Sequence, residues 1–414
     1  MVKLICIKNV NWGNNMEQNK IRNKILAISG QPVTGKGTNI KAIIEKLKQM
    51  GYAEENIHLE STGNEFRKYF NIIVELIQSL DDEENVKKLT ESEELKKIFS
   101  NNEYRKAFTE TLAMLKKSGL DLSKFNIEQA NNLEEFKKIR KIVDTLIDEG
   151  IKEKGIEINS QSRPDDIWII DSRLAFYNIP DAFSVRLTAS PDVAAQRLLQ
   201  DKTRGKEDSK YKDIAEAKEA RERRRIGETS RYLQRYGVNL EDENNYDLII
   251  DTSYSSINDI SDTILKCSEL FYQGKPFEKK WTSPKLLLPL QEERLTYGKA
   301  LYDLEEIIQS IRENGYYPSS PVEIVEADGL KGIVEGHHRN FGAAYDGLTL
   351  VPYIVLAKDD EKLPGKSITA RQYMQGLTAS KLYGHEELIG KEFSYKEVYP
   401  DIYEKLKQKE QEER

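Results

Sequence analysis

A glycine-rich segment at residues 30–38 most constrains what this chain can fold into. It reads Gly-Gln-Pro-Val-Thr-Gly-Lys-Gly-Thr, and it follows the short apolar run Lys24-Ile-Leu-Ala-Ile-Ser29 directly. Helical periodicity begins straight after it, over residues 36–50. A strand, a glycine-rich turn and a helix in this order form the context of a phosphate-binding P-loop. The order predicts an α/β fold and excludes an all-helical one.

Each residue type in this segment suits a polyphosphate. Glycines let backbone N–H groups turn toward phosphate oxygens, and the helix N-terminus adds partial positive charge. Lys36 would neutralise the β and γ phosphates, and the Thr38 hydroxyl is a candidate ligand for Mg²⁺ or its waters. A plain turn between strand and helix is the alternative. The candidate nucleotide-binding residues are Gly30, Thr34, Gly35, Lys36, Gly37 and Thr38.

Further short apolar runs alternate with helical stretches as far as residue 272. This alternation predicts a parallel sheet with flanking helices. The stretch from about 64 to 155 is helical and highly charged, as is the one ending near 235. Beyond the first strand, the expected strands are 57–60, 166–171, 184–188 and 246–251.

Residues 273–285 carry proline, glycine and charge without periodicity, which predicts a domain boundary. We therefore expect an N-terminal arm at 1–20, a parallel α/β domain at 21–275 with a helical insertion at 68–160, and a smaller α+β domain at 285–414. The smaller domain has a helical pattern at 299–313, strand patterns at 322–325, 332–334 and 351–356, and a helical pattern at 339–346. Its last ten residues are nearly all charged and predict a frayed helix.

Composition limits the possible partners. The 414 residues include 63 Lys and Arg and 70 Asp and Glu, a net charge of −7, which argues against nucleic-acid binding by bulk charge. Hydrophobic residues at 38% can build a core, and no apolar run reaches the roughly 18 residues that a membrane helix needs. Cys6 and Cys267 cannot form a disulfide framework. The expectation is a cytoplasmic protein that binds small molecules and no membrane.

The pattern Gly-x-Pro-x-x-Gly-Lys-Gly-Thr resembles the loop of the nucleoside monophosphate kinase family, which includes adenylate kinases and archaeal-type cytidylate kinases. Ser61-Thr-Gly-Asn-Glu-Phe-Arg67 resembles the Ser-Thr-Gly-Asp-x-x-Arg segment of that family. Asp171-Ser-Arg173-Leu-Ala resembles its Gly-Arg-Leu-Ala segment, with Ser172 in place of glycine. Residues 221–239 and 246–253 are similar to the same group.

This resemblance implies a kinase that uses ATP and Mg²⁺. The resemblance implies that Arg67 binds the acceptor phosphate. It also gives Ser61, Thr62, Gly63 and Arg173 as substrate-binding residues. Arg221 and Arg231 match lid arginines that close on the transferring phosphoryl group.

The residue chemistry agrees with the resemblance. Phosphoryl transfer needs positioning and charge neutralisation more than covalent chemistry, and guanidinium groups match phosphate geometry. Asp171 ends an apolar strand and is a candidate carboxylate for Mg²⁺ or for positioning water. Each arginine, taken alone, also suits a solvated helix surface. About 100 residues separate Arg67 from Asp171, which points to a bulkier acceptor, a non-nucleotide acceptor or a structural insertion.

A second constellation is Glu335-Gly336-His337-His338-Arg339, which follows a strand pattern and opens a helix. Its first-turn N–H groups and Arg339 predict an anion site, with a capped polar turn as the alternative. Adjacent histidines point in different directions, so a two-histidine metal site is not expected.

The order and spacing of residues 285–360 resemble the ParB/sulfiredoxin-like family, and among its members the free-serine kinases. This implies a second nucleotide site, for ATP or ADP, on Gly336, His337, His338 and Arg339. The same resemblance makes Glu292 or Glu293 a candidate base for an acceptor hydroxyl, and Glu335 a metal or acceptor carboxylate.

The favoured hypothesis is an ATP- and Mg²⁺-dependent kinase whose acceptor is CMP, dCMP or a similar nucleoside monophosphate. In this hypothesis the ParB-like domain binds a second nucleotide or performs a second phosphoryl transfer. The alternatives are a kinase for a free amino-acid hydroxyl or another small molecule, and a nucleotide-controlled partition protein that binds DNA.

Overall fold

The computed structural model describes residues 24–126, 130, 133–134, 136–161, 163–200, 211–289, 299–316, 320–375 and 388–412. Within these residues one continuous sheet runs through the molecule, in the strand order β2-β3-β1-β4-β5-β6-β10-β8-β9-β7. The strands are β1 (Lys24–Gly30), β2 (Ile57–Ser61), β3 (Ile167–Asp171), β4 (Phe183–Thr188), β5 (Leu248–Asp251), β6 (Lys280–Thr282), β7 (Leu287–Leu288), β8 (Val322–Ala327), β9 (Leu330–Glu335) and β10 (Val351–Lys358).

The N-terminal half of the sheet, from β2 to β5, is parallel throughout, as the sequence predicts. Both of its faces are covered, because alternate residues of β1 enter different cores. Leu26 and Ile28 pack toward α1 (Lys36–Gln49) and α11 (Ile257–Tyr272), whereas Ile25 packs against α7 (Phe136–Ser160) and α8 (Ala175–Asn178). Burial on both faces explains why β1 is an uninterrupted apolar run.

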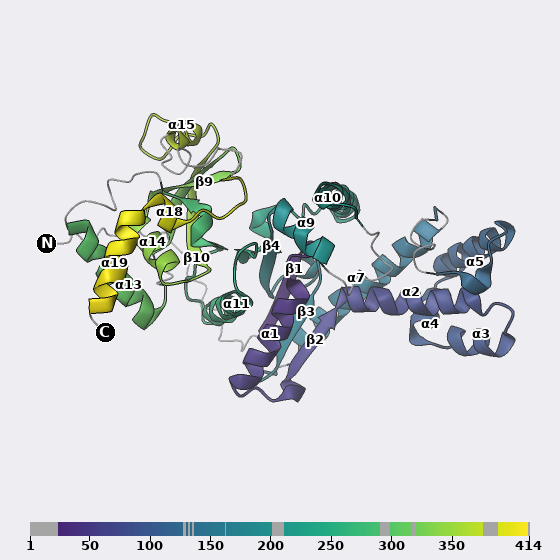
Figure 1. Ribbon diagram of the computed structural model, residues 1–414. Helices are drawn as coiled ribbons and strands as arrows, with labels where there is room; N and C mark the ends of the chain where they lie inside the picture. The colour runs from purple at the N-terminus through teal and green to yellow at the C-terminus, as the bar shows by residue number, and fades with distance from the viewer. Residues whose placement is uncertain are drawn as a thin grey trace.

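The helical insertion projects away from the sheet as an arm, at the right of Figure 1. Its helices pack around their own apolar cluster, which includes Phe70, Leu95, Phe108 and Phe136. The arm consists of α2 (Thr62–Gln78), α3 (Glu83–Thr90), α4 (Glu93–Ser100), α5 (Asn102–Lys117) and α7 (Phe136–Ser160). Because α2 follows β2 directly and α7 leads back to β3, the base of the arm lies at the carboxyl ends of the strands.

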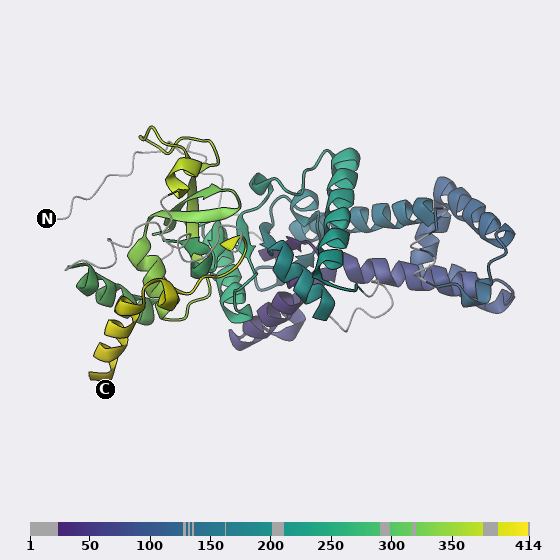
Figure 2. The same ribbon diagram turned by 45° about the horizontal axis from the view of Figure 1, so that its top comes forward.

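The remaining helices of this half lie near the same edge of the sheet. Figure 2 shows α10 as a long helix beside the base of the arm. These helices are α8 (Ala175–Asn178), α9 (Pro191–Gln200) and α10 (Ile214–Tyr236), with short 3₁₀ turns at Glu54–Asn56, Leu122–Lys124, Glu243–Asn245 and Pro284–Leu286.

The C-terminal unit surrounds β7 to β10, at the opposite end of the molecule from the arm (Figure 1). Its helices are α13 (Lys299–Asn314), α14 (His337–Tyr345), α15 (Ala370–Met374), α18 (Tyr395–Val398) and α19 (Pro400–Glu412). The charged tail, expected to fray, instead forms most of α19, where Ile402 and Leu406 are buried in the core of this unit.

The segment predicted to be an irregular boundary contains β6. This strand pairs in parallel with β5 of the first half and antiparallel with β10 of the C-terminal unit. Trp281 of β6 is buried in the same apolar cluster as Leu248 and Leu350, so the two halves share core as well as sheet. Of the described helices, none is long and apolar enough to cross a bilayer.

Candidate active site

A cavity of about 1450 Å³ lies at the carboxyl ends of the parallel strands. This is where α/β sheets place their ligands, and its volume exceeds the roughly 300–1,000 Å³ of a site for one drug-sized molecule. The glycine-rich residues 30–38, hereafter the glycine loop, form one wall. The other walls come from the start of α2, from α7, from the residues after β3, from α10 and from the segment between β5 and α11.

The backbone of the glycine loop requires its glycines. At Gly30 φ is 153°, and a Cβ there would lie 2.6 Å from the carbonyl oxygen of Leu187. Gly35, with φ 81°, precedes the first turn of α1. Val33 has φ 60°, a conformation that a β-branched residue adopts at a cost of about 1–3 kcal/mol. Strain of this kind concentrates at ligand-binding turns.

Two residues far along the chain hold this strained loop. Thr252, just after β5, places its Oγ1 3.0 Å from the Thr34 carbonyl and 2.9 Å from the Thr188 carbonyl, so these two carbonyls share its one hydroxyl hydrogen. Arg197 of α9 donates to the Thr252 carbonyl at 2.5 Å and to the Val33 carbonyl at 3.4 Å. The loop conformation therefore depends on β5 and α9 as well as on its own sequence.

Lys36 and Asp171 meet in the centre of the cavity. Lys36 Nζ lies 3.6 Å from Asp171 Oδ1, and Ser61 Oγ donates to Asp171 Oδ2 at 3.1 Å. The Thr62 hydroxyl donates to the Asp171 carbonyl at 3.1 Å. Thr38 is exposed and lines the same cavity. The cavity therefore brings together the predicted lysine, the predicted carboxylate and hydroxyl groups from two separate segments.

The start of α2 places the predicted acceptor residues on the arm side of the cavity. Gly63 and Arg67 both line it, and Arg67 Nη2 donates to Asn64 Oδ1 at 2.6 Å. The stacked rings of Phe66 and Phe70, with centroids 4.4 Å apart, line the cavity behind them. An exposed guanidinium in front of an aromatic wall suits a ligand with a phosphate and a planar ring.

Helix α10 contributes an arginine and a carboxylate that form ion pairs with residues of other elements. Arg231 Nη1 lies 3.2 Å from Asp144 Oδ2 of α7, and Arg173 forms an ion pair with Glu228 of α10. Burial raises the pKa of Asp144, whereas burial lowers the pKa of Arg173 to about 10. Unpaired charges would be costly at this depth, so these groups are held by each other.

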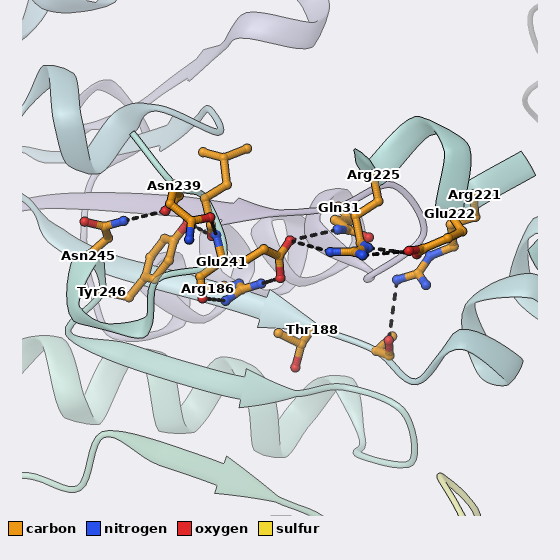
Figure 3. A network of polar contacts seen from close by, with 12 residues as sticks. Gln31, Arg186, Thr188, Arg221, Glu222, Arg225, Asn239, Glu241, Asn245 and Tyr246 are labelled. Carbon is orange, nitrogen blue, oxygen red and sulfur yellow. Dashed lines mark hydrogen bonds and ion pairs between the residues drawn. The ribbon is translucent and has the colours of Figure 1, made fainter. Parts of the chain in front are cut away.

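Arg221 is not brought into the cavity. Its Nη2 lies 3.5 Å from the Ala189 carbonyl, two to three turns along α10 from Arg231. Figure 3 shows it beside a polar network in which Glu241 accepts from Arg186 at 2.5 Å and from Gln31 at 3.2 Å. Arg225 of α10 also lies 3.8 Å from Glu241. The network thus links the glycine loop, β4 and α10 behind the cavity.

The second predicted constellation lies in the C-terminal unit, away from this cavity. Gly336 has φ 95° and precedes α14, and a Cβ on it would lie 3.1 Å from Arg339 Nη2. His337 is buried, Glu335 is exposed, and Arg339 Nη2 lies 3.4 Å from the Pro321 carbonyl. The predicted helix N-terminus is therefore present. Glu292 and Glu293 fall outside the described residues.

Several residues of the large cavity were not singled out from the sequence. Except for Thr252, which lies between β5 and α11, they sit inside helices, where a cavity residue has the same local pattern as a surface residue. In the parts of the chain that the structure describes, no group of three or more His, Cys, Asp or Glu side chains is placed to hold a metal ion. The unpredicted cavity residues include Phe66, Phe70, Arg140, Asp144, Asp148, Arg197, Arg224, Glu228, Tyr232 and Thr252.

Comparison with known proteins gives partial matches. No family model matches the chain. An S-adenosylmethionine-dependent nucleotide dehydratase from Lacinutrix mariniflava is 29% identical over 152 residues, 37% of this chain and 27% of that protein. A cytidylate kinase from Pyrobaculum arsenaticum is 29% identical over 147 residues, 35% of this chain and 67% of that protein. The chain thus spans about a quarter of the dehydratase's length.

A solved structure of an uncharacterized protein from Eubacterium ventriosum has a TM-score of 0.31 and 14% identity, covering 60% of this chain and 99% of that one. A score of this size does not show a shared fold. The cytidylate kinase match supports a nucleotide-kinase-like region in this chain.

Proposed function

We propose that the large cavity transfers the γ-phosphoryl group of ATP to a nucleoside monophosphate. The observation that carries the proposal is the meeting of Lys36, Asp171 and Arg67 around one cavity, beside a glycine loop held in a strained conformation. Phosphoryl transfer is driven by positioning and charge neutralisation, and this site supplies both. The volume of the cavity accommodates a donor and an acceptor together.

In this proposal the glycine loop and Lys36 bind the β and γ phosphates of ATP. Mg²⁺ keeps several waters and takes only one or two protein ligands beside the phosphates, so the Thr38 hydroxyl and Asp171 suffice to position it. Arg67 binds the acceptor phosphate. Arg173 and Arg231 exchange their carboxylate partners, Glu228 and Asp144, for phosphate oxygens when the ligands bind.

The acceptor is CMP or dCMP in this proposal. Arg140 and Asp144 of α7 line the same cavity as Phe66, and in this proposal they meet the edge of a base stacked on that ring. A carboxylate accepts from the cytosine amino group, and a guanidinium donates to the ring carbonyl. The names of both curated relatives concern nucleotides, which favours a nucleotide over an amino-acid acceptor.

The test is a panel of acceptors with ATP and Mg²⁺, read by mass spectrometry. CMP, dCMP, UMP, AMP, GMP, serine and threonine are each incubated with the full chain. The proposal predicts the diphosphate of a cytosine nucleotide as the fastest product. Turnover of serine or threonine alone would assign the kinase activity to the C-terminal unit instead.

The C-terminal unit is proposed as a second nucleotide site of the ParB/sulfiredoxin-like type. His338 Nε2 is buried and has no hydrogen-bond partner among the described residues, next to the left-handed Gly336 at the start of α14. A diphosphate at that helix N-terminus would give it one. Binding of ADP to a Lys36→Ala chain, and its loss on adding Arg339→Ala, would support this site. Retention of short DNA at low salt would favour the partition-protein alternative instead.

A further inference from the structure

The segment between β5 and α11, residues 252–256, joins the glycine loop to the C-terminal unit. At its start, Thr252 binds the Thr34 carbonyl of the glycine loop. Further along, Ser255 and Ile257 line the cavity on the side away from the arm. Ile257 leaves 47% of its surface exposed there. If phosphates occupy the glycine loop, this wall, with its exposed Ile257, is where the nucleoside of the donor would lie.

One residue of the C-terminal unit, Thr349, makes two hydrogen bonds to this segment. The backbone N–H of Ser256 donates to Thr349 Oγ1 at 2.8 Å. Ser255 Oγ lies 3.0 Å from the Thr349 carbonyl and 3.0 Å from the Asp251 carbonyl, so these two carbonyls share its one hydrogen. The N–H of Thr349 donates to Asp259 Oδ2 at 3.2 Å, and its hydroxyl donates to the same carboxylate. Thr349 therefore binds both the segment and the first turn of α11.

Thr349 is itself held firmly in the C-terminal unit. Leu350, the next residue, is buried in the apolar cluster shared with Trp281, and β10 begins at Val351. Leu348 N donates to the Ala343 carbonyl of α14 at 2.9 Å. A second contact comes from Tyr254, whose hydroxyl donates to the Gly390 carbonyl at 3.0 Å. Residues 254–256 of the donor-side wall are thus held by the C-terminal unit, whereas Thr252 and Ser253 are held by Arg197 of the N-terminal half.

We propose that Thr349 is a positioning residue for the donor nucleotide: it fixes residues 254–257 so that they can receive the nucleoside of ATP. The inference rests on the proposed function, because it assumes that the donor occupies the glycine loop. The C-terminal unit is then part of the donor site, although none of its described residues lines the cavity. The acceptor side, built on α2 and α7, makes no use of this contact.

The test uses the full chain with Thr349→Val, which keeps the shape and removes the hydroxyl. The expected result is a KM for ATP raised about fivefold to tenfold, the equivalent of one or two lost hydrogen bonds, with kcat and the KM for the acceptor changed less than about twofold. Thr349→Ser keeps the hydroxyl and should restore the wild-type KM. Tyr254→Phe should raise the same KM by a smaller factor.

Thr282→Val is the matched control. Thr282 also lies in the shared sheet, but its buried hydroxyl has no hydrogen-bond partner among the described residues, so its KM values should stay at wild type. Calorimetric titration of each variant with ATP and Mg²⁺ gives the same comparison without turnover.

An unchanged ATP affinity in Thr349→Val overturns the inference, and so does an equal rise in both KM values, which would indicate general loosening. If Thr349→Val does not fold, an unchanged ATP affinity in Tyr254→Phe overturns it. If the wild-type chain binds ATP but transfers no phosphoryl group to any acceptor, the proposed function is refuted. The comparison of ATP affinities then still tests whether Thr349 positions the donor nucleotide. A wild-type chain that binds no ATP overturns both.

Discussion

Several cationic side chains in the cavity form ion pairs with carboxylates, and these pairs determine which charges a ligand can replace. The cations at the centre of the cavity face carboxylates from other elements: Lys36 faces Asp171, Arg173 faces Glu228, and Arg231 faces Asp144. Buried charges need such partners, and a highly charged ligand can replace them. This arrangement lets a site rich in arginine stay folded and still exchange its partners for phosphate oxygens.

Lys36 gives the sharpest prediction at this scale. Lys36→Ala should lower kcat by about 10²–10³-fold, the usual cost of losing one group that stabilises the transition-state charge. Its thermal unfolding should remain a single transition close to that of the wild type. Lys48→Ala, on the outer side of the same helix and paired with Glu54, is the matched control and should leave kcat unchanged. Equal activity of the two variants would contradict the assignment of Lys36.

The partly buried carboxyl group of Asp148 should make the free energy of unfolding depend on pH. Burial raises its pKa above the ordinary value of 3.8, although the Tyr236 hydroxyl, 2.6 Å away, opposes the shift. The folded chain therefore holds this proton to a higher pH than the unfolded chain. The contribution is present below pH 3.8 and is lost as the pH rises through the raised pKa.

The wild type should therefore lose stability relative to Asp148→Asn as the pH rises from about 4 to about 7. Urea unfolding of both chains across that range measures the difference. A difference in the free energy of unfolding that stays constant with pH, or that changes in favour of the wild type, would show that burial does not raise the pKa of Asp148.

At the scale of elements, α10 closes the cavity by packing on α7. Its C-terminal turns make the contacts, through Arg231 to Asp144 and Tyr236 to Asp148. Ten residues separate Arg221 from Arg231, about 15 Å along a helix, which explains why Arg221 contacts the segment between β4 and α9 instead of the cavity. The residues of α10 that line the cavity lie between Arg224 and Tyr232.

This division predicts unequal effects of arginine substitutions along one helix. Arg231→Ala should lower kcat by about 10²-fold, because it removes a phosphate-binding group from the cavity. Arg223→Ala, whose side chain is exposed and paired with Glu219, should leave kcat within a factor of about two. Steady-state kinetics of both variants decides this, and similar losses in the two would mean that α10 acts as a whole.

Much of this element order was predictable from the sequence, for identifiable reasons. The apolar run of β1 and the glycines of the loop are local signals, so the strand, the loop and α1 could be read directly. The cavity residues on α7 could not, because Asp144 and Asp148 repeat every four residues like any charged helix face. The Thr252 contact to the glycine loop joins residues 218 positions apart, which no local pattern encodes.

At the scale of the whole molecule, β6 makes one sheet of two units. The sequence predicts a boundary here because three residues are too few to show periodicity and the flanks carry proline and glycine. Pairing on both sides, and the burial of Trp281 between the units, appear only in the folded chain. A substitution in β6 should consequently destabilise both halves of the molecule.

Hydrogen exchange tests this coupling. Trp281→Ala should cost about 3–5 kcal/mol and accelerate exchange in both β1 and β8, on either side of β6. Leu95→Ala, buried in the separate cluster of the arm, should accelerate exchange in α2 and α7 but not in β8. Faster exchange confined to the C-terminal unit in the Trp281 variant would indicate two independent domains.

The central claim, that donor and acceptor nucleotides bind across one cavity, is tested most directly by calorimetric titration with adenosine and cytidine joined through five phosphates. The account predicts one molecule bound per chain, more tightly than ATP or CMP alone, with affinity lost in both Lys36→Ala and Arg67→Ala. Binding no tighter than that of ATP, or binding that survives both substitutions, would contradict it.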